Sequence, residues 1–300
     1  MLKDKHVLLI DGMALLFRSF FSTSVTGQFM INSSGIPTNG VQGFLKHTLL
    51  SIKEFNPTHV AVCWDMGSVT FRNDMFDGYK SNRDAPPVEL LPQFDFAKES
   101  AEALGLSNIG VVGYEADDCI GTLAKGYSKE VKVSILSGDH DLLQLVDEHI
   151  NVHILKKGYG QYSTYSKKAF IEEKGITPSQ FIDVKAFMGD TSDGYPGVRG
   201  IGEKTATKLI QEYGSIEGVL NNLHLLTNAQ QRKINENLDM LHLSRQLAKI
   251  YCEVPFPDVW TPSIWNGVSS LFHDYVLKHE LRTVDRFLST NFQINKENLA

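Results

Sequence analysis

Apolar and polar residues alternate in blocks along the first half of this 300-residue chain. Short runs rich in β-branched residues are typical of buried strands, and longer runs with apolar residues every three or four positions are typical of helices. The strand-like runs are HVLLID, THVAVCWD, IGVVGYE, VKVSILS and INVHIL, and the helical runs are VQGFLKHTLLSIKEF, LPQFDFAKESAEALG and ADDCIGTLAKGYS. This alternation predicts an α/β domain with a mostly parallel central sheet flanked by helices.

The alternation is interrupted once and ends before residue 175. Residues 68–95 are too polar for a core element and too many for an ordinary connection, so we expect a functional excursion there. The later periodicity is helical, and a glycine-rich turn, GVRGIG, separates two of the helical runs. We therefore expect a first domain at 1–174, a second, helical domain at 175–255, and a tail at 256–300 that packs back on the core.

Aspartates close three of the strand-like runs. Asp11 follows HVLLI, Asp65 follows THVAVCW, and two more acids follow VKVSILSG. The carboxyl ends of neighbouring parallel strands meet at one edge of a sheet, where open α/β folds keep their active sites. Two further clusters, YEADD and GDTSDG, bring the number of acids in short patterned contexts to nine. The remaining acids are Glu115, Asp117, Asp118, Asp139, Asp141, Asp190 and Asp193.

Nine converging carboxylates need a positive partner, because two of them ~4 Å apart repel by roughly 4 kcal/mol at an effective dielectric constant of 20. Oxygen ligands without histidine or cysteine select magnesium or manganese over zinc. Nine acids exceed the need of one ion and match two ions about 3.5–4 Å apart, the arrangement of many nucleases and polymerases. Taken singly, each acid is also explained by a turn, a helix start or a loop cap.

Composition indicates a soluble globular protein, with 42% hydrophobic and 21% charged residues. Three widely spaced cysteines give neither a disulfide framework nor zinc-ligand spacing. The formal net charge of −6 becomes +3 without the nine clustered acids, which allows a basic surface around an acidic pit. The chain starts without a cationic leader and has no apolar run of about 18 residues, so we expect a cytoplasmic protein without a membrane span.

Two short basic segments carry the opposite charge. In GYKSNR, Tyr79 could stack on a base, and Lys80 and Arg83 could face one phosphate if this piece is helical, although a solvated basic loop explains it equally well. In GVRGIGEKT, Glu203 separates the glycine and lysine that a phosphate-binding P-loop needs to be adjacent. A hairpin between two helices fits better, with backbone amides reaching a DNA phosphate and nearby cations adding sequence-independent attraction. Those cations are Arg199, Lys204 and Lys208.

Together these motifs resemble the 5′ nucleases, the family of flap endonucleases and 5′→3′ exonucleases that includes the amino-terminal nuclease domain of bacterial DNA polymerase I. The similarity covers about residues 5–255 and rests on LLIDG, FRSF, VCWD, GYKSNR, YEADD, SGDHDLLQL and MGDTSDGYPGVRGIGEKTA. It implies a PIN-like core with a helical arch at about 68–95 and a helical helix-hairpin-helix DNA-binding domain. We expect a stand-alone bacterial enzyme without a polymerase.

The resemblance also implies two Mg²⁺ ions, with Mn²⁺ as a substitute. The first site would consist of Asp11, Asp65, Glu115 and Asp117. The second would consist of Asp139, Asp141 and Asp193, with Asp118 and Asp190 supporting it through water. The side chains that we expect to be catalytic are Asp117, Asp139, Lys80 and Arg83.

DNA contacts follow from the same resemblance. Arg18 would lie near the scissile phosphate, and Lys80 and Arg83 would bind phosphate in the arch. The helix-hairpin-helix would grip duplex DNA with Arg199, Lys204, Lys208 and the amides of Gly200 and Gly202. Backbone carbonyls of Gly200, Ile201 and Gly202 would hold a potassium ion.

We therefore expect a structure-specific nuclease that cuts DNA near junctions of single and double strands, on flaps, nicks and RNA-primed Okazaki-type ends with a free 5′ terminus. A water prepared by metal would attack, leaving 5′-phosphate and 3′-hydroxyl ends. The family implies primer and flap removal in replication and repair, by a cytoplasmic monomer acting at the nucleoid. Two alternatives stay open: a non-catalytic branched-DNA-binding protein, and an RNA-cleaving PIN-type nuclease, against which GYKSNR and GVRGIGEKTA count.

Overall fold

A seven-stranded sheet forms the centre of the computed structural model, which describes residues 5–25, 27–257 and 261–295. The strand order is β3-β2-β1-β4-β5-β6, and β7 pairs with β2. The strands are β1 (His6–Asp11), β2 (His59–Cys63), β3 (Ser107–Ile109), β4 (Lys132–Ser137), β5 (Ile150–Leu155), β6 (Tyr162–Tyr165) and β7 (Ser263–Ile264). Pairings among β1 to β5 are parallel, whereas β6 and β7 run antiparallel to their neighbours. The predicted mostly parallel sheet is confirmed.

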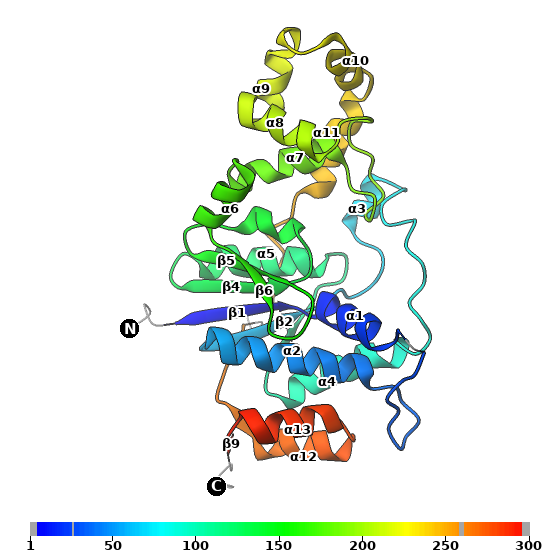
Figure 1. Ribbon diagram of the computed structural model, residues 1–300, viewed down its shortest axis with the longest axis vertical. Helices are drawn as coiled ribbons and strands as arrows, with labels where there is room; N and C mark the ends of the chain where they lie inside the picture. The colour runs from blue at the N-terminus through cyan, green and yellow to red at the C-terminus, as the bar shows by residue number, and fades with distance from the viewer. Residues whose placement is uncertain (1–4, 26, 258–260, 296–300) are drawn as a thin grey trace.

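Helices cover both faces of this sheet (Figure 1). Alternate residues of β1 point to opposite sides, so Val7 and Leu9 pack in one cluster and Leu8 and Ile10 in the other. Because all four are buried, the strand reads as a continuous apolar run. The first cluster includes α5 (Ala116–Tyr127), and the second includes α1 (Gly12–Thr23), α2 (Asn39–Phe55) and α4 (Leu91–Ala103).

A helical domain stands at one end of the molecule (Figure 1). Phe181, Val184 and Leu209 of this domain belong to the same apolar cluster as Val7 and Leu9 of the sheet, so one core joins the two parts. Helix α6 (Lys167–Lys174) leads into this domain, whose elements are α7 (Phe181–Met188), α8 (Glu203–Tyr213), α9 (Ile216–Asn221), α10 (Asn228–Glu236) and α11 (Leu238–Ala248), with short 3₁₀ turns at Pro178–Gln180 and Leu223–Leu225.

The last helices, α12 (Ser270–Lys278) and α13 (Arg282–Asn291), lie at the opposite end, beside α2 and α4 (Figure 1). The Thr283 backbone N–H donates to Oε1 of Gln42 at 2.7 Å, and the hydroxyls of Ser100 and Tyr275 lie 3.1 Å apart. Two short strands, β8 (Val268–Ser269) and β9 (Ile294–Asn295), pair beside them. No helix among the described residues has the length and apolar character needed to span a bilayer.

The polar excursion contains one short helix, α3 (Phe71–Met75), and then turns until α4 begins at Leu91. Gly78 and the pair Pro86-Pro87 disfavour helix in between, because glycine is flexible and proline restricts the residue before it. The helical part of the expected arch is therefore limited to α3 and the start of α4. Lys80 and Arg83 lie in the turns, so they do not share a helix face.

Candidate metal centre

Three neighbouring strands bring three of the predicted acids to one edge of the sheet. Asp11 is the last residue of β1 and pairs with Cys63, two residues before Asp65. The Ser137 hydroxyl at the end of β4 donates to Oδ2 of Asp11 at 2.6 Å, and the same hydroxyl accepts from the backbone N–H of Asp139 at 2.9 Å. The order β2-β1-β4 therefore places Asp65, Asp11 and Asp139 side by side.

Helix α5 adds the next two acids. Glu115 caps the helix, and Asp117 lies in its first turn, where the positive end of the helix dipole favours carboxylates. The backbone N–H of Ala116 donates to Oδ1 of Asp65 at 2.7 Å, which ties the start of the helix to the end of β2. A hydrogen bond from the backbone of YEADD thus holds this motif against the end of β2.

Seven of the nine acids line two adjoining cavities. The larger has a volume of about 170 Å³, and the smaller, of about 20 Å³, has room for roughly one water. The acids around the larger cavity are Asp11, Asp65, Glu115, Asp117 and Asp139. The acids around the smaller cavity are Glu115, Asp117, Asp139, Asp141 and Asp193. The structure therefore brings both predicted sets of carboxylates together, with Glu115, Asp117 and Asp139 shared.

Crowding and burial make three of these carboxylates, Asp11, Asp117 and Asp141, hard to ionise. Burial raises the pKa of Asp11 to about 7, and the charges of Asp65 and Asp139 add to the increase. Burial, with help from Asp139, likewise raises the pKa of Asp141 to about 7. The pKa of Asp117 is raised by burial and by Asp139 and Asp11. A divalent cation at this edge of the sheet would relieve the repulsion.

Side-chain cations already contact several of the acids. Lys80 lies 2.7 Å from Glu115, and Arg83 lies 2.7 Å from Asp193. Lys185 of α7, which was not predicted, lies 2.6 Å from Asp141 and also contacts Asp190. The only sequence signal for Lys185 is a lysine among apolar residues of α7, which is too common on helices to be specific.

The donor set fits magnesium chemistry, although the side chains are not arranged as a finished site. Among the residues that the structure describes, no three carboxylate, imidazole or thiol groups converge closely enough to hold an ion. The contacts to Lys80, Arg83 and Lys185 turn several carboxylates toward those cations. Magnesium takes few carboxylates directly and keeps several waters, so an ion there would need only a few of these acids as direct ligands. The assignment of each ligand stays a prediction.

Tyr79 lies under the acids rather than out in solvent. Its side chain is 2% exposed, and its hydroxyl lies 3.2 Å from both Glu115 Oε2 and Asp193 Oδ2, to which it can donate. Gly194 approaches the same turn so closely that a Cβ there would lie 2.5 Å from the Gly78 carbonyl oxygen. The prediction that Tyr79 stacks on a base is therefore wrong, because packing of the turn against the GDTSDG loop buries the ring.

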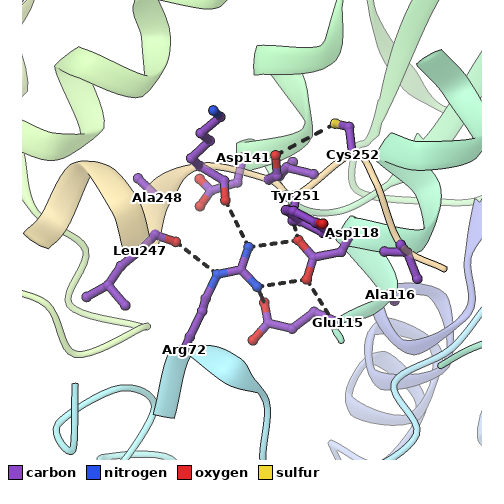
Figure 2. A network of polar contacts seen from close by, with 12 residues as sticks. Arg72, Glu115, Ala116, Asp118, Asp141, Leu247, Ala248, Tyr251 and Cys252 are labelled. Atoms are coloured by element: carbon purple, nitrogen blue, oxygen red, sulfur yellow. Dashed lines mark hydrogen bonds and ion pairs between the residues drawn. The ribbon is translucent and has the colours of Figure 1, made fainter. Parts of the chain in front are cut away.

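Asp118 also differs from its predicted role. Its side chain is fully buried, and its two oxygens accept a two-pronged contact from Arg72 at 2.8 Å (Figure 2). The same oxygens accept the backbone N–H groups of Glu115 and Tyr251 at 3.1 and 2.8 Å. With these partners Asp118 has no free face toward a metal-bound water, so we assign it a structural role.

Arg18 and Asp190 line a third cavity of about 460 Å³, which Asp139 also borders. Asp141 and Lys185 share this cavity. The Arg18 guanidinium donates to the backbone carbonyl of Lys156, and Arg18 shares the cavity lining with the acids. Its contact with a phosphate stays a prediction. Asp190 shapes its own loop by accepting from the backbone N–H of Ser192 at 2.7 Å.

The glycine-rich hairpin lies at the start of α8, whose N-cap is Gly202. Gly200 has φ +81°, and a Cβ there would lie 2.8 Å from Nζ of Lys233, so only glycine suits this position. The exposed residues of the hairpin and the first turns of α8 are Arg199, Gly200, Gly202, Glu203, Lys204 and Lys208. They form an accessible surface with three cations and one acid, a net positive charge that suits contact with a phosphate backbone.

The predicted potassium site does not fit the hairpin. The Gly200 carbonyl oxygen accepts from the Lys233 ammonium group at 2.9 Å. The Gly202 carbonyl oxygen accepts the N–H groups of Thr205 and Ala206 at 3.0 Å, as the first turn of α8 requires. Two of the three carbonyls, counting that of Ile201, thus have partners, and a lysine supplies the positive charge.

Two family models match consecutive parts of the chain. The model described as "5'-3' exonuclease, N-terminal resolvase-like domain" matches residues 6–175. The model described as "5'-3' exonuclease, C-terminal SAM fold" matches residues 176–267. The two matches meet where the sheet region passes into the helical domain.

Known proteins show the same similarity. The chain is 53% identical over 287 residues to a 5'-3' exonuclease of Bacillus subtilis (strain 168), covering 96% of this chain and 97% of that protein. It is 42% identical to DNA polymerase I of Lactococcus lactis subsp. cremoris (strain MG1363) over 85% of this chain, which is 30% of that protein. A flap endonuclease of bacteriophage T5, solved as a pseudo-enzyme-product complex with DNA and metal ions, shares the fold, with a TM-score of 0.67 and 21% identity, covering 95% of this chain and 97% of that one.

Proposed function

Because the chain belongs to the 5′-3′ exonuclease family, we propose that it is a magnesium-dependent, structure-specific nuclease that hydrolyses DNA near a single-strand to double-strand junction. The observation that carries this proposal is the pair of adjoining cavities lined by seven carboxylates. Such a site suits phosphoryl transfer with two metal ions. It offers no serine, cysteine or histidine nucleophile among its lining residues, which favours water as the attacking group.

The acids would divide between the two ions as the cavities divide them. Asp11 and Asp65 face only the larger cavity, Asp141 and Asp193 face the smaller, and Glu115, Asp117 and Asp139 face both. When bound, magnesium ions would lower the pKa of a water and stabilise charge on the phosphate oxygens. We retain Mn²⁺ as a substitute and leave potassium out, because Lys233 contacts the Gly200 carbonyl.

Lys80 and Arg83 would then exchange partners. They now neutralise Glu115 and Asp193, and a metal ion would take over that task. The released ammonium and guanidinium groups would face the larger cavity, which both residues line. There they can stabilise negative charge that develops on a phosphate, which is the kind of electrostatic help that contributes most to many enzymes. Arg18 would hold the phosphate from the side of the third cavity.

The helical domain would grip the duplex beside the junction. Its exposed Arg199, Lys204 and Lys208 carry charge without base-reading geometry, so binding should weaken with salt and ignore sequence. The solved T5 relative contains DNA and metal ions, which supports DNA as the substrate. We infer flaps, nicks and RNA-primed ends with a free 5′ terminus as the substrates, and primer and flap removal by a cytoplasmic monomer as the task.

Cleavage of a DNA duplex with a 5′ flap tests the proposal. Parallel DNA substrates labelled at the 5′ end and at the 3′ end, and a matched single-stranded RNA, would be incubated with Mg²⁺, with Mn²⁺ or with EDTA. The flap end would be either free or blocked by a bulky group. The proposal predicts Mg²⁺-dependent cuts near the junction, a 5′-phosphate on the downstream product, and loss of cleavage when the end is blocked. Cleavage of RNA alone, or binding without cleavage in either metal, would support the PIN-type or the branch-binding alternative instead.

A further inference from the structure

Arg72 is an arginine buried in the protein at the start of the excursion. Its side chain is 2% exposed, and it belongs to α3. Both terminal nitrogens of its guanidinium contact the two oxygens of Asp118 at 2.8 Å (Figure 2). Arginine is the residue that matches a carboxylate in this two-pronged way, so the pair is geometrically exacting as well as charged.

The same guanidinium binds the end of the helical domain. Its Nε donates to the Leu247 carbonyl oxygen of α11 at 3.1 Å, and Nη2 donates to the Lys249 carbonyl oxygen at 2.9 Å. The chain then turns back to the sheet domain, where the Tyr251 N–H donates to Asp118 at 2.8 Å. Figure 2 shows Arg72 between Leu247 on one side and Asp118 on the other. The excursion, α11 and α5 thus meet at one side chain.

The network ends on a candidate metal ligand. Oδ2 of Asp118 accepts the backbone N–H of Glu115 at 3.1 Å, which completes the capping box at the start of α5. The Nη1 atom of Arg72 also lies 3.6 Å from Oε2 of Glu115. Glu115 lines both carboxylate cavities, so its backbone and its side chain are both held from the direction of Arg72.

We propose that Arg72 is a positioning residue for the metal centre: through Asp118 it fixes Glu115, and it anchors that position on the end of α11. The inference rests on the proposed metal-dependent function and concerns no atom that touches substrate. Partners that orient a metal ligand commonly contribute about 10- to 100-fold to metal affinity. Because of the two-pronged contact, lysine should not be able to take over the role of Arg72, since an ammonium group cannot reproduce the paired contact of a guanidinium.

Metal binding measured without catalysis tests the inference. Free Mn²⁺ would be followed by electron paramagnetic resonance during titration of the metal-free protein, and thermal unfolding would be recorded alongside. The variants are Arg72→Lys, which keeps the charge, and the double variant Arg72→Met/Asp118→Asn, which leaves no unpaired buried charge. Arg245→Met is the matched control, because Arg245 also braces α11, by an ion pair with Asp183 at 2.7 Å. Its ion pairs within the described part of the chain are with Asp183 and Glu217, and neither is a metal-centre acid.

We expect Arg72→Lys and the double variant to bind Mn²⁺ about tenfold more weakly, and to need correspondingly more Mg²⁺ for flap cleavage. Arg245→Met should unfold at a lower temperature and bind Mn²⁺ like the wild type. Wild-type Mn²⁺ affinity in either folded Arg72 variant would overturn the inference, and the double variant decides if Arg72→Lys does not fold. If the wild type binds Mn²⁺ but cleaves no flap, the proposed function fails. The role of Arg72 is still tested in that case, by the difference in Mn²⁺ affinity between the wild type and the Arg72 variants.

Discussion

The ammonium nitrogen of Lys80 lies 2.7 Å from Oε1 of Glu115, so the basic turn reaches directly into the acidic cluster. Lys80 has φ +54°, a left-handed conformation that is uncommon for residues other than glycine, and its N–H donates to the Asp193 carbonyl oxygen at 2.8 Å. Burial acts to lower the pKa of Lys80, but Glu115 and Asp193 outweigh it and raise the pKa. The lysine is therefore a permanent cation held at the cavity by its own backbone.

Replacing Lys80 by methionine should slow cleavage far more than it weakens binding. Loss of one group that stabilises the transition state typically costs about 10²- to 10³-fold in rate. Single-turnover cleavage of a 5′ flap at saturating enzyme measures the rate, and fluorescence anisotropy in EDTA measures the affinity. Lys168→Met is the control, since Lys168 is 84% exposed on α6 and forms an ion pair with Glu172 of the same helix, away from the metal-centre acids. An equal effect of the two substitutions would contradict the role of Lys80.

The raised pKa values of Asp11 and Asp141 predict a pH dependence of stability. Each pKa moves from 3.8 to about 7 on folding, so the folded state binds more protons between pH 4 and 7. The contribution of these two groups to the free energy of unfolding of the metal-free protein should therefore decrease as pH rises through that window. The variant Asp11→Asn/Asp141→Asn should gain stability relative to the wild type from pH 5 to 7.5.

Thermal unfolding in EDTA at several pH values checks this difference. The comparison with the variant is needed because His47 and His153, whose pKa values burial lowers to about 4, act in the opposite direction with pH. Added Mg²⁺ should stabilise the wild type more at pH 8 than at pH 6, since ligands must lose their protons to bind metal. If the wild type in EDTA became more stable than the double variant as pH rises, the raised pKa values of Asp11 and Asp141 would be refuted.

The contact between Lys233 and the Gly200 carbonyl predicts that DNA binding does not need potassium. Wild-type affinity for a flap duplex should be the same in K⁺ and in tetramethylammonium at equal ionic strength. Lys233→Met should bind several-fold more weakly in tetramethylammonium and should recover in part when K⁺ replaces it. A strong K⁺ requirement in the wild type, unchanged in Lys233→Met, would restore the carbonyl site for potassium.

The buried hydroxyl of Tyr79 predicts a defect in Tyr79→Phe, which keeps the ring and loses only the contacts to Glu115 and Asp193. Hydrogen bonds to charged groups contribute about 1.5–3 kcal/mol, so we expect a lower unfolding temperature and about tenfold slower cleavage. Flap affinity should not change. If Tyr79→Phe behaves like the wild type and Tyr79→Ala loses affinity for single-stranded flaps, the tyrosine acts by stacking after all.

The positions of the strand-end acids could be predicted from the sequence. The apolar runs mark the strands, and a parallel sheet brings the carboxyl ends of neighbouring strands together. Asp11 closes an apolar run, and parallel neighbours must end at the same edge, so the meeting of Asp11, Asp65 and Asp139 follows from pattern alone. The helical domain follows equally well, since its 3.6-residue period and glycine turn are local features. The helical domain is confirmed as part of the fold by the match to the C-terminal family model and by the likeness to the T5 structure.

Contacts between distant segments could not be predicted in the same way. Arg72 and Asp118 lie 46 residues apart, and nothing in either segment marks the other as its partner. Tyr79 is part of a motif that reads as exposed and basic, yet a turn packed against Gly194 buries it. Lys185 lies within an apolar stripe whose burial is evident only in three dimensions. Side-chain direction in irregular segments depends on packing, which sequence periodicity does not encode.

Asp139→Ala tests the central claim most directly, because Asp139 lines all three cavities at the carboxylate edge. The measurement is single-turnover cleavage of a 5′ flap duplex in Mg²⁺, with flap affinity in EDTA recorded on the same preparations. The account predicts efficient cleavage by the wild type and at least a thousandfold loss in Asp139→Ala with affinity retained, about 4 kcal/mol in activation free energy. Cleavage by Asp139→Ala within a few-fold of the wild-type rate would contradict the metal centre proposed here.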